Sequence, residues 1–499
     1  MINHSEAWSN QNWRKLQTNL FRLQKRIYKA MQNGDNRKVK NLQRLVLKSR
    51  AARMLAVRQV TQLNSGKKTC GIDGLKSLNF EQRLDLAETL KLANNWEHEG
   101  LREVEIPKKN GKIRTLKIPT IADRAWQCLV KYALEPAHEA TFHARSYGFR
   151  PGRRTQDAQK YIFDNLKSLV NGQNKRVIEL DIEKCFDRIN HTAIMSKVIA
   201  PRQIKIGLWR CLKAGVNPEF PEQGTPQGGV VSPLLANIAL NGIEDIHPCV
   251  RYADDMVFFL KPNDKAEKII KKVQQFLTER GMNVLTEKTK ITRSIEGFDF
   301  LGWHFLVQKN GKFRCTPNKE NYEKLRKKVK AIVNSSVLAT TAKAKKLAPI
   351  IRGWKNYHRY CQMDGSRFSL WYLSQDAFNR FKTDKNKGKN EAKKLVNQAF
   401  PAVPYSENKF VMVKGIKSPY DGDLLYWSKR NSHLYDGQTA KALKRQGDKC
   451  GHCGLYLDHN ERVHLHHING NHDNWKTKNL VAIHESCHDY IHMGKRSKT

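Results

Sequence analysis

Two adjacent aspartates between two apolar runs constrain the fold of this chain more than any other feature. Residues 250–259 read VRYADDMVFF. Short apolar runs on either side of a polar pair predict two strands joined by a tight hairpin, with both carboxylates at its tip. Residues 179–187, ELDIEKCFD, predict a third strand that ends near Asp181, just before a turn into a helix. A carboxylate in that position lies at the rim of a sheet.

Three carboxylates at strand ends suit nucleotidyl transfer. That reaction uses two Mg²⁺ ions about 3.5 to 4 Å apart, bound by hard oxygen ligands, which activate the attacking 3′-oxygen and neutralise the leaving pyrophosphate. Asp181, Asp254 and Asp255 are the candidate ligands. An Asp-Asp pair is also ordinary turn chemistry, so the pair alone leaves both interpretations open.

The hydrophobic pattern changes along the chain. Apolar residues at steps of three and four between residues 13 and 27 predict a helical N-terminal segment. Short apolar runs between about residues 103 and 260 predict a mixed α/β domain. After residue 311 the helical period returns, which predicts an all-α segment. The Lys-rich stretch 382–394 then has the composition of a linker or flexible arm.

Length and charge indicate several domains and a nucleic-acid partner. A chain of 499 residues is expected to form roughly three or four domains. Its 90 lysines and arginines exceed 47 acidic residues and give a formal net charge of +43. This surplus favours a polyanionic partner, although a merely soluble basic protein would show it too. No apolar run is long enough for a bilayer and the start lacks a signal-peptide pattern, so we expect an intracellular protein without a membrane partner.

The cysteines fall into two groups. Those of the first 361 residues are scattered singly and are expected to be buried thiols. The other three belong to the pairs Cys450-x₂-Cys453 and His484-x₂-Cys487, a set sufficient for a tetrahedral, structural Zn²⁺ site. Two neighbouring histidines, His452 and His488, could compete for this metal.

The motifs around the aspartates resemble those of reverse transcriptases. The tetrad 252–255, YADD, is similar to the signature of that family, and the flanking blocks follow in the family's order. Residues 106–114 look like its fingers hairpin, 146–154 like its template-contacting block, 223–235 like its nucleotide-pocket block and 300–303 like its primer grip. The resemblance implies a right-hand polymerase with mixed α/β fingers and palm, dNTPs as substrates, and two Mg²⁺ ions at the three aspartates.

The same resemblance assigns four residues to the incoming nucleotide. Lys109 and Arg114 would grip the triphosphate, with Lys108 as a further candidate, although a basic hairpin tip is also an ordinary solvated turn. Gln227 would contact the sugar or base. Phe186 would pack on the deoxyribose and crowd a 2′-hydroxyl, although plain core packing would also explain an aromatic residue there.

Residues 352–360, RGWKNYHRY, look like the maturase (X) region of group II intron-encoded proteins, which forms the thumb and helps bind intron RNA. Alternating rings and cations suit RNA, because rings stack on unpaired bases while cations hold phosphates. A thumb helix would bury several of these aromatic residues in any case. The Lys-rich stretch that follows matches the family's DNA-binding region by position and charge.

The C-terminal segments 463–471, VHLHHINGN, and 487–492, CHDYIH, resemble the ββα-metal fold of HNH endonucleases. The resemblance implies that His467 is the general base, that His466 and His488 hold one catalytic divalent ion, expected to be Mg²⁺, and that Asn479 orients the region of the base. His492 is an alternative ligand and His464 a support. The alternative is a structural zinc module that binds DNA without cutting it.

The whole series resembles a bacterial group II intron-encoded protein. We expect a multidomain α+β chain whose parts are, in order, a basic helical extension of the fingers (1–95), fingers and palm (96–310), an all-α thumb/maturase domain (311–380), a basic DNA-binding region or linker (381–438) and a small ββα-metal HNH domain (439–499).

The resemblance implies three activities: assisting the splicing of intron RNA, nicking target DNA, and extending the exposed 3′ end by reverse transcription. Its partners would be group II intron RNA, bound by one copy or by a homodimer, target DNA and dNTPs, in the cytoplasm and at the nucleoid. Two alternatives stay open. One is a reverse transcriptase of another retroelement, and the other is a splicing cofactor without catalytic activity.

Overall fold

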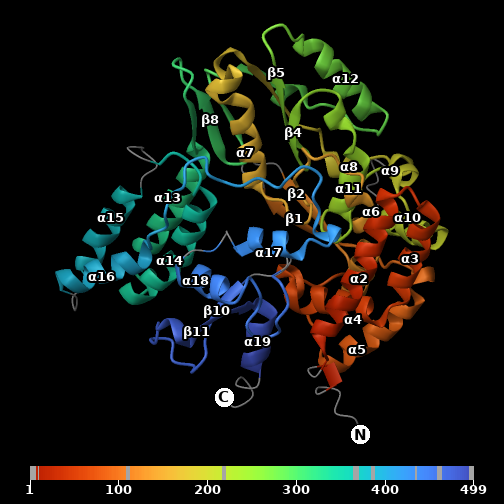
Figure 1. Cartoon of the computed structure of the whole chain (residues 1–499), viewed down its shortest axis with the longest axis horizontal. Helices are drawn as coiled ribbons and strands as arrows, with labels where there is room; N and C mark the ends of the chain where they lie inside the picture. The colour runs from red at the N-terminus through yellow and green to blue at the C-terminus, as the bar shows by residue number, and fades with distance from the viewer. Residues whose placement is uncertain are drawn as a thin grey trace.

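The computed structural model of the chain describes residues 7–8, 11–107, 113–215, 221–363, 370–383, 388–432, 435, 437–457 and 463–493. The N-terminal helices lie on the lower right in Figure 1, a mixed α/β region above them, a second set of helices on the left and the C-terminal elements at the bottom. The mixed α/β fold predicted from the sequence is therefore present. None of the helices in the described part of the chain combines the length and the hydrophobicity of a membrane span.

The N-terminal part consists of helices α2 (Trp13–Gln32), α3 (Asn36–Lys48), α4 (Arg50–Arg58) and α5 (Phe80–Thr89). Each begins where a polar side chain accepts a hydrogen bond from a backbone N–H of the first turn; these caps are Asn12, Asp35, Ser49 and Asn79. The first three helices pack on the long helix α6 (Ile121–Glu139). Their apolar faces belong to one core that continues into the mixed α/β region, so the N-terminal helices do not form a core of their own.

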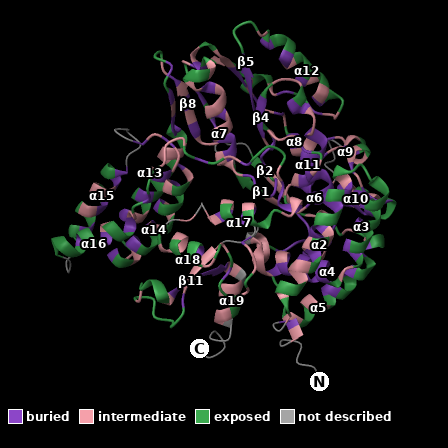
Figure 2. Ribbon diagram, viewed as in Figure 1, coloured by how far each residue is buried: buried purple, intermediate pink, exposed green. Residues whose placement is uncertain are grey.

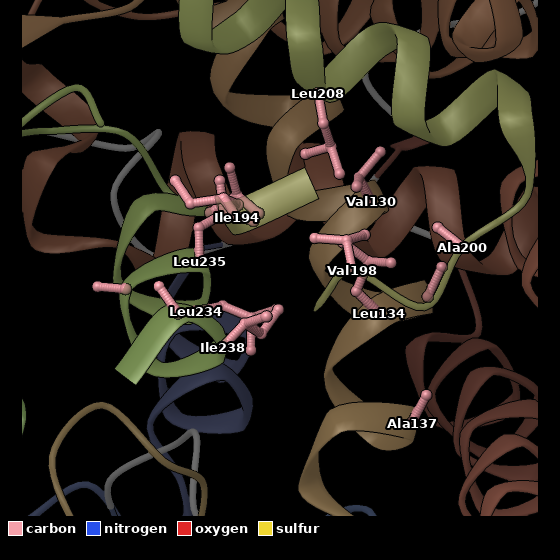
Figure 3. Packing of buried hydrophobic residues seen from close by; sticks show 14 of the residues in the cluster. Val130, Leu134, Ala137, Ile194, Val198, Ala200, Leu208, Leu234, Leu235 and Ile238 are labelled. Carbon is pink, nitrogen blue, oxygen red and sulfur yellow. The ribbon is translucent and has the colours of Figure 1, made fainter. Parts of the chain in front are cut away.

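Further helices extend this core. Figure 3 shows aliphatic side chains that meet there, among them Val130 and Leu134 of α6, Leu208 of α10 and Leu235 of α11. The helices of this region are α7 (Thr155–Leu166), α8 (Cys185–Arg188), α9 (His191–Lys197), α10 (Arg202–Ala214), α11 (Ser232–Leu240) and α12 (Ala266–Thr278). Short helical segments lie between the longer elements. Those of the N-terminal part are η1 (Gln59–Leu63), η2 (Ser65–Lys68) and η3 (Leu90–Asn95). Those of the mixed α/β region are η4 (Ser168–Val170), η5 (Gly172–Asn174), η6 (Ile243–Asp245) and η7 (Thr286–Lys288). The seven single cysteines before residue 362 are buried free thiols, as predicted.

The central sheet has antiparallel strands in the order β4 (Cys249–Tyr252), β5 (Asp255–Leu260), β3 (Arg176–Leu180) and β6 (Lys290–Arg293). Alternate residues of β5 enter different cores: Met256 and Phe258 join the core of the N-terminal helices, whereas Val257 and Phe259 join a second core. Figure 2 shows β4 and β5 as buried strands between helices. Burial of both faces explains why β5 is a continuous apolar run, and it leaves the rim as the place for charged groups.

Two smaller sheets flank the central one. A hairpin of β1 (Arg102–Pro107) and β2 (Ile113–Ile118) lies where the fingers hairpin is expected. The strands β7 (Phe298–Phe300), β8 (Trp303–Val307) and β9 (Phe313–Pro317) form the other sheet, which leads into the second set of helices.

We call that second set the thumb helices: α13 (Lys319–Val333), α14 (Thr340–Tyr357), α15 (Trp371–Lys382) and α16 (Lys389–Ala399). The predicted stripe of α13 is present, because Leu325 and Val329 are buried in the second core. The Lys-rich stretch 382–394 differs from the linker or flexible arm that its composition predicts. From Lys389 it is helix α16, whose Ala392 and Leu395 pack into the thumb core against α14 and α15.

After the thumb, residues 410–432, which we call the strap, cross back over the mixed α/β region. The strap contains η8 (Pro419–Asp421) and α17 (Leu424–Ser432). Both carboxylate oxygens of the buried Asp157 on α7 accept hydrogen bonds from Arg430 at 2.7 Å. The Tyr420 hydroxyl donates to Glu135 of α6 at 2.7 Å, and the Trp427 ring lies against Gly152. The strap is thus packed against the mixed α/β region, although the sequence of this part of the chain suggests a linker.

The C-terminal part contains α18 (Gly437–Arg445), β10 (Val463–His467), η9 (Thr477–Asn479), β11 (Leu480–His484) and α19 (Glu485–Met493). The two strands are antiparallel, and α19 packs on both of them. The order strand, strand, helix is the one that a ββα fold requires. Asn431 of the strap donates to the Leu457 carbonyl at 3.2 Å and so joins this part to the strap.

We predict that Trp427→Ala lowers the free energy of unfolding by about 3 to 5 kcal/mol, because it removes a large ring that is 4% exposed and leaves a cavity over Gly152. The measurement is denaturant unfolding followed by circular dichroism. The control is Trp371→Ala, since Trp371 is 57% exposed and its loss should cost less than about 1 kcal/mol. Equal, small effects of the two substitutions would show that the strap is not packed as described.

Candidate functional site

Three aspartates lie at one rim of the central sheet. Tyr252 pairs with Asp255 across the β4–β5 hairpin, so Ala253 and Asp254 form its two-residue turn. Leu180 pairs with Met256, which puts Asp181 and Asp255 at the same end of neighbouring strands. The hairpin and the strand predicted from the sequence are present, and they bring the candidate ligands to the same edge.

The carboxylates at this rim repel one another. The Asp255 side chain reaches solvent on one side, but protein surrounds it on the others. This partial burial, together with the charges of Asp254 and Asp181, raises the pKa of Asp255 to about 7. The Lys288 ammonium opposes the shift and lies 2.5 Å from an oxygen of Asp181. A divalent cation would remove the repulsion, so this set of hard oxygen donors fits Mg²⁺.

The three aspartates do not converge on a single point. Among the described residues, the side chains close enough to share one ion form two C-terminal clusters. Asp181 is instead turned toward Lys288, at the end of η7. The sequence analysis did not single out Lys288, because one lysine in a strongly basic chain gives no signal.

The turn that presents Asp254 has an unusual backbone conformation. Ala253 has φ +60°, a region that residues other than glycine rarely adopt. Residues 145–148, which come much earlier in the chain, run beside β4. The Tyr147 N–H donates to the Arg251 carbonyl at 2.9 Å. A Cβ on Gly148 would lie 2.3 Å from the Ala253 nitrogen. Gly148 is therefore required by the close approach of two parts of the protein.

Block 146–154 is held mainly by contacts within the protein. Arg150 is 5% exposed and donates to Glu139 at 2.8 and 3.0 Å, and Arg153 donates to the Lys417 carbonyl of the strap at 3.1 Å. The sequence interpretation gave the glycines of this block to a template strand. In the structure Gly148 admits the catalytic turn and Gly152 admits the Trp427 ring.

Two of the predicted nucleotide-binding residues lie on neighbouring loops beside the rim. The half-buried Phe186 ring lies 6.3 Å, centroid to centroid, from the Phe149 ring in an edge-to-face contact. The Thr225 N–H donates to the Phe186 carbonyl at 2.7 Å, and the Gln227 amide donates to Asp187 at 3.0 Å. Phe186 also packs against the main core. The Phe186 ring therefore packs on the core and stays partly exposed.

The predicted triphosphate contacts fall on the fingers hairpin. Lys109, like Lys108, lies outside the described residues. The backbone of Arg114 is in β2, opposite Ile106, but its side chain lies outside what the structure describes.

The aromatic residues of segment 352–360 face inward. The Tyr357 ring stacks on Trp303 with centroids 4.7 Å apart, and the Trp354 indole donates to Asn321 at 2.8 Å. Burial lowers the pKa of His358 to about 3, so this histidine is neutral and cannot serve as a phosphate-binding cation. Packing against β8, the thumb helices and the strap accounts for these aromatic residues, whereas Arg352 is exposed.

The four predicted zinc ligands lie together in the C-terminal part. The ligand atoms of Cys450, Cys453, His484 and Cys487 are all within 4.8 Å of one another. Nδ1 of His484 lies 3.4 Å from the Cys453 sulfur and 3.9 Å from the Cys487 sulfur. Three sulfurs and one imidazole at such distances fit tetrahedral Zn²⁺. Neither of the competing histidines joins the cluster, because the His452 ring faces Tyr490 and His488 belongs to a second group.

That second group consists of His466, His488 and His492, whose ligand nitrogens also lie within 4.8 Å of one another. It contains the two predicted metal ligands and the alternative one. The His464 ring lies 5.0 Å from that of His488, in the supporting position expected from the sequence. Three imidazoles with room for a fourth ligand fit a divalent ion that keeps an open position.

His467 lies on the face of β10 opposite to that of His466, and it is 6% exposed. Its ring lies 5.0 Å from His472 and 5.1 Å from Trp475, two residues that the sequence analysis did not single out. The loop that carries them is fixed by Asn479, whose side chain donates to the Asn474 carbonyl at 2.8 Å and accepts from the Asn469 N–H at 3.1 Å. Asn479 thus orders the chain that follows His467.

Comparison with known families identifies a domain over the part of the chain that contains the central sheet. Residues 106–305 match the family described as reverse transcriptase (RNA-dependent DNA polymerase), and residues 8–90 match the N-terminal domain of reverse transcriptase. Residues 322–397 match the group II intron, maturase-specific domain. The chain therefore contains a reverse transcriptase domain, which supports RNA-directed DNA polymerase activity.

Two known relatives indicate which type of reverse transcriptase the chain resembles. Maturase-like protein 1 of Euglena gracilis is 38% identical over 397 residues, which cover 79% of this chain and 86% of that protein. The group II intron-encoded protein LtrA of Lactococcus lactis subsp. cremoris is 27% identical over 50% of this chain and 54% of its own length. The chain belongs to the reverse transcriptase and maturase family of the group II intron type. Its bacterial source stays a prediction.

Among solved structures, telomerase from Candida albicans aligns with 62% of this chain and 62% of its own, at 13% sequence identity and a TM-score of 0.33.

We predict that Gly148→Ala reduces the rate of primer extension on an RNA template by at least about 100-fold, because the new methyl group would displace the turn that carries Asp254. The control is Gly388→Ala, an exposed glycine at the start of α16 with ordinary φ and open space around its Cβ position. Primer extension by Gly148→Ala at the wild-type rate would mean that the close contact between segment 145–148 and the turn is absent in the working enzyme.

Proposed function

We propose that Asp181, Asp254 and Asp255 hold two Mg²⁺ ions and that this site extends a DNA primer on an RNA template. The observation that supports this most is the strand register that brings the three carboxylates to one rim, within a reverse transcriptase domain. When bound, the ions would activate the primer 3′-oxygen and neutralise the leaving pyrophosphate.

The chain's own residues bind and orient the substrates. The exposed part of Phe186 packs on the deoxyribose and crowds a 2′-hydroxyl, which favours dNTPs over NTPs. Gln227, whose amide is oriented by Asp187, contacts the sugar or base. Lys109 and Arg114 hold the triphosphate, since an ammonium and a guanidinium fork both suit phosphate oxygens. Lys288 pairs with Asp181 and offsets its negative charge.

The maturase activity is proposed for the thumb helices and the basic N-terminal helices. The match to the maturase-specific domain supports it, as do the exposed cations of the thumb, among them Lys327, Lys328, Lys345, Lys346 and Arg352. Cations of this kind bind the phosphates of a folded RNA, and the affinity should fall steeply with salt. The RNA is proposed to be the group II intron itself, whose splicing the protein assists, as one copy or as a homodimer.

The C-terminal part is proposed to be an HNH endonuclease that nicks target DNA. His467 would take a proton from the attacking water. His466, His488 and His492 would hold the divalent ion, Mg²⁺, which would polarise the scissile phosphate when bound. The cluster of Cys450, Cys453, His484 and Cys487 would hold a structural Zn²⁺. The support is the ββα order and the two ligand groups.

The activities would act in sequence in the cytoplasm and at the nucleoid. Nicking one DNA strand yields a free 3′ end, which is what the polymerase site needs as a primer. Bound intron RNA would then serve as the template.

We predict that Asp254→Asn/Asp255→Asn lowers primer extension at least about 1,000-fold, since metal ligation supplies several kcal/mol of transition-state stabilisation. Splicing of the intron RNA should continue, because it depends on binding. The control is Asp85→Asn, an exposed aspartate of α5. Wild-type protein that assists splicing but extends no primer would identify a splicing cofactor without catalytic activity. Primer extension with no effect on splicing would favour a reverse transcriptase that serves another retroelement.

We predict that His467→Ala lowers the nicking of target DNA about 100-fold or more while primer extension on a pre-nicked substrate is unchanged, because only the general base is removed. His452→Ala, at an exposed histidine outside both clusters, is the matched control.

Elemental analysis should find about one zinc per wild-type chain and much less after Cys453→Ser. Bound zinc without any nicking by the wild-type protein would favour a DNA-binding zinc module.

A further inference from the structure

A buried ion pair lies beneath the turn that carries Asp254. Arg251 of β4 and Glu244 of η6 both have fully buried side chains, and Nε of Arg251 donates to Oε1 of Glu244 at 2.6 Å. The residues around Arg251 in β4 are otherwise apolar or aromatic. A charge in the middle of a buried strand is unfavourable unless it is paired and hydrogen-bonded, so its presence calls for an explanation.

The guanidinium of Arg251 also holds the turn itself. Nη1 donates to the Ala253 carbonyl at 3.0 Å and to Oδ1 of Asn237 on α11 at 2.9 Å. The Asn237 amide in turn donates to the Gly148 carbonyl at 2.9 Å. Arg251 therefore ties together the catalytic turn, helix α11 and segment 145–148.

The turn needs such support because its conformation is strained. Ala253 has φ +60°, and non-glycine residues hold such angles only where the surrounding structure fixes them. The Ala253 carbonyl belongs to the rigid peptide plane that joins Ala253 to Asp254. A hydrogen bond to this oxygen sets the orientation of the plane and hence the direction in which the Asp254 side chain leaves the backbone.

We propose that Arg251, held by Glu244 and Asn237, is a positioning residue that aims the Asp254 carboxylate. The proposal rests on the polymerase chemistry proposed above. A planar guanidinium suits this position, because it donates to Glu244 through Nε and to the Ala253 carbonyl through Nη1, two separate nitrogens in one fixed plane, whereas a lysine has a single nitrogen for both acceptors. Loss of this residue should affect the chemical step and the Mg²⁺ requirement and should leave dNTP binding nearly unchanged.

The test compares Arg251→Lys with Arg124→Lys in the full-length protein. Arg124 of α6 is a matched control, since it is also buried, at 4% exposed, and its guanidinium donates to the Gly66 and Thr69 carbonyls at 3.1 and 2.7 Å, outside the turn. For Arg251→Lys we expect kcat of primer extension to fall at least about 30-fold, KM for dNTP to stay within about threefold, and half-saturating Mg²⁺ to rise several-fold. Arg124→Lys should lower kcat less than about threefold at a similar unfolding midpoint.

A rescue separates positioning from a general structural role. Glycine adopts positive φ without strain, so Ala253→Gly should restore kcat about tenfold in the Arg251→Lys background and should not raise it in the Arg124→Lys background. If Arg251→Lys does not fold, Glu244→Gln, which keeps the shape of the partner, should show the same loss of kcat and the same Mg²⁺ shift.

Three results would overturn the positioning role while primer extension by the wild type stands: equal kcat for the two lysine variants, a loss confined to KM, or no rescue by Ala253→Gly. Absence of primer extension by the wild-type protein would overturn the polymerase proposal, and the positioning role with it.

Discussion

The pairing of β3 with β5 fixes where the chemistry of this chain takes place. Because successive side chains alternate between faces, a shift of one residue would turn Val257 toward the wrong core and would move Asp181 away from Asp255. The two faces are buried in different cores, so both cores specify the same register. The carboxylates can then lie only at the strand ends, where the sheet meets solvent.

The carboxylate rim also depends on the contacts that hold block 146–154 against the β4–β5 turn. Gly148 lets segment 145–148 approach the turn, while Gly152 of the same block lets Trp427 of the strap approach from the other side. Arg150 and Arg153 fill the space between these contacts and pair with Glu139. Burial and, after it, the charges of Asp254 and Asp181 raise the pKa of Asp255, on a backbone that these contacts hold in place.

The features that could be predicted from the sequence depend on short spacings. Adjacent aspartates between apolar runs predict a hairpin, and two pairs spaced by two residues predict a metal cluster; in each case the local pattern already limits the geometry. The N-terminal helices and the helices after residue 311 followed from periodicity in the same way, whereas the fingers and thumb assignments came from the resemblance. His484 was identified because its spacing to Cys487 repeats that of Cys450 to Cys453.

The features that could not be predicted depend on long-range packing. An alternation of aromatic and basic residues looks the same whether the rings stack on RNA or on Trp303, and only the tertiary structure decides for Tyr357. The strap is basic and irregular, yet Asp157, more than 250 residues earlier, gives Arg430 a buried partner. Arg251 did leave a trace in the sequence, as a charge within an apolar strand, but its partners Glu244 and Asn237 carry no pattern that links them to it.

The strap also limits how the two proposed active sites can move. It contacts the mixed α/β region through Arg430 and Trp427 and the C-terminal part through Asn431. Releasing the strap would separate a buried, doubly hydrogen-bonded ion pair and uncover the Trp427 ring, so these contacts favour the bound position of the strap. Relative rotation of the two parts would break these contacts. If one DNA strand is first nicked and then extended by the same chain, its 3′ end must therefore travel from one site to the other while the protein keeps its shape.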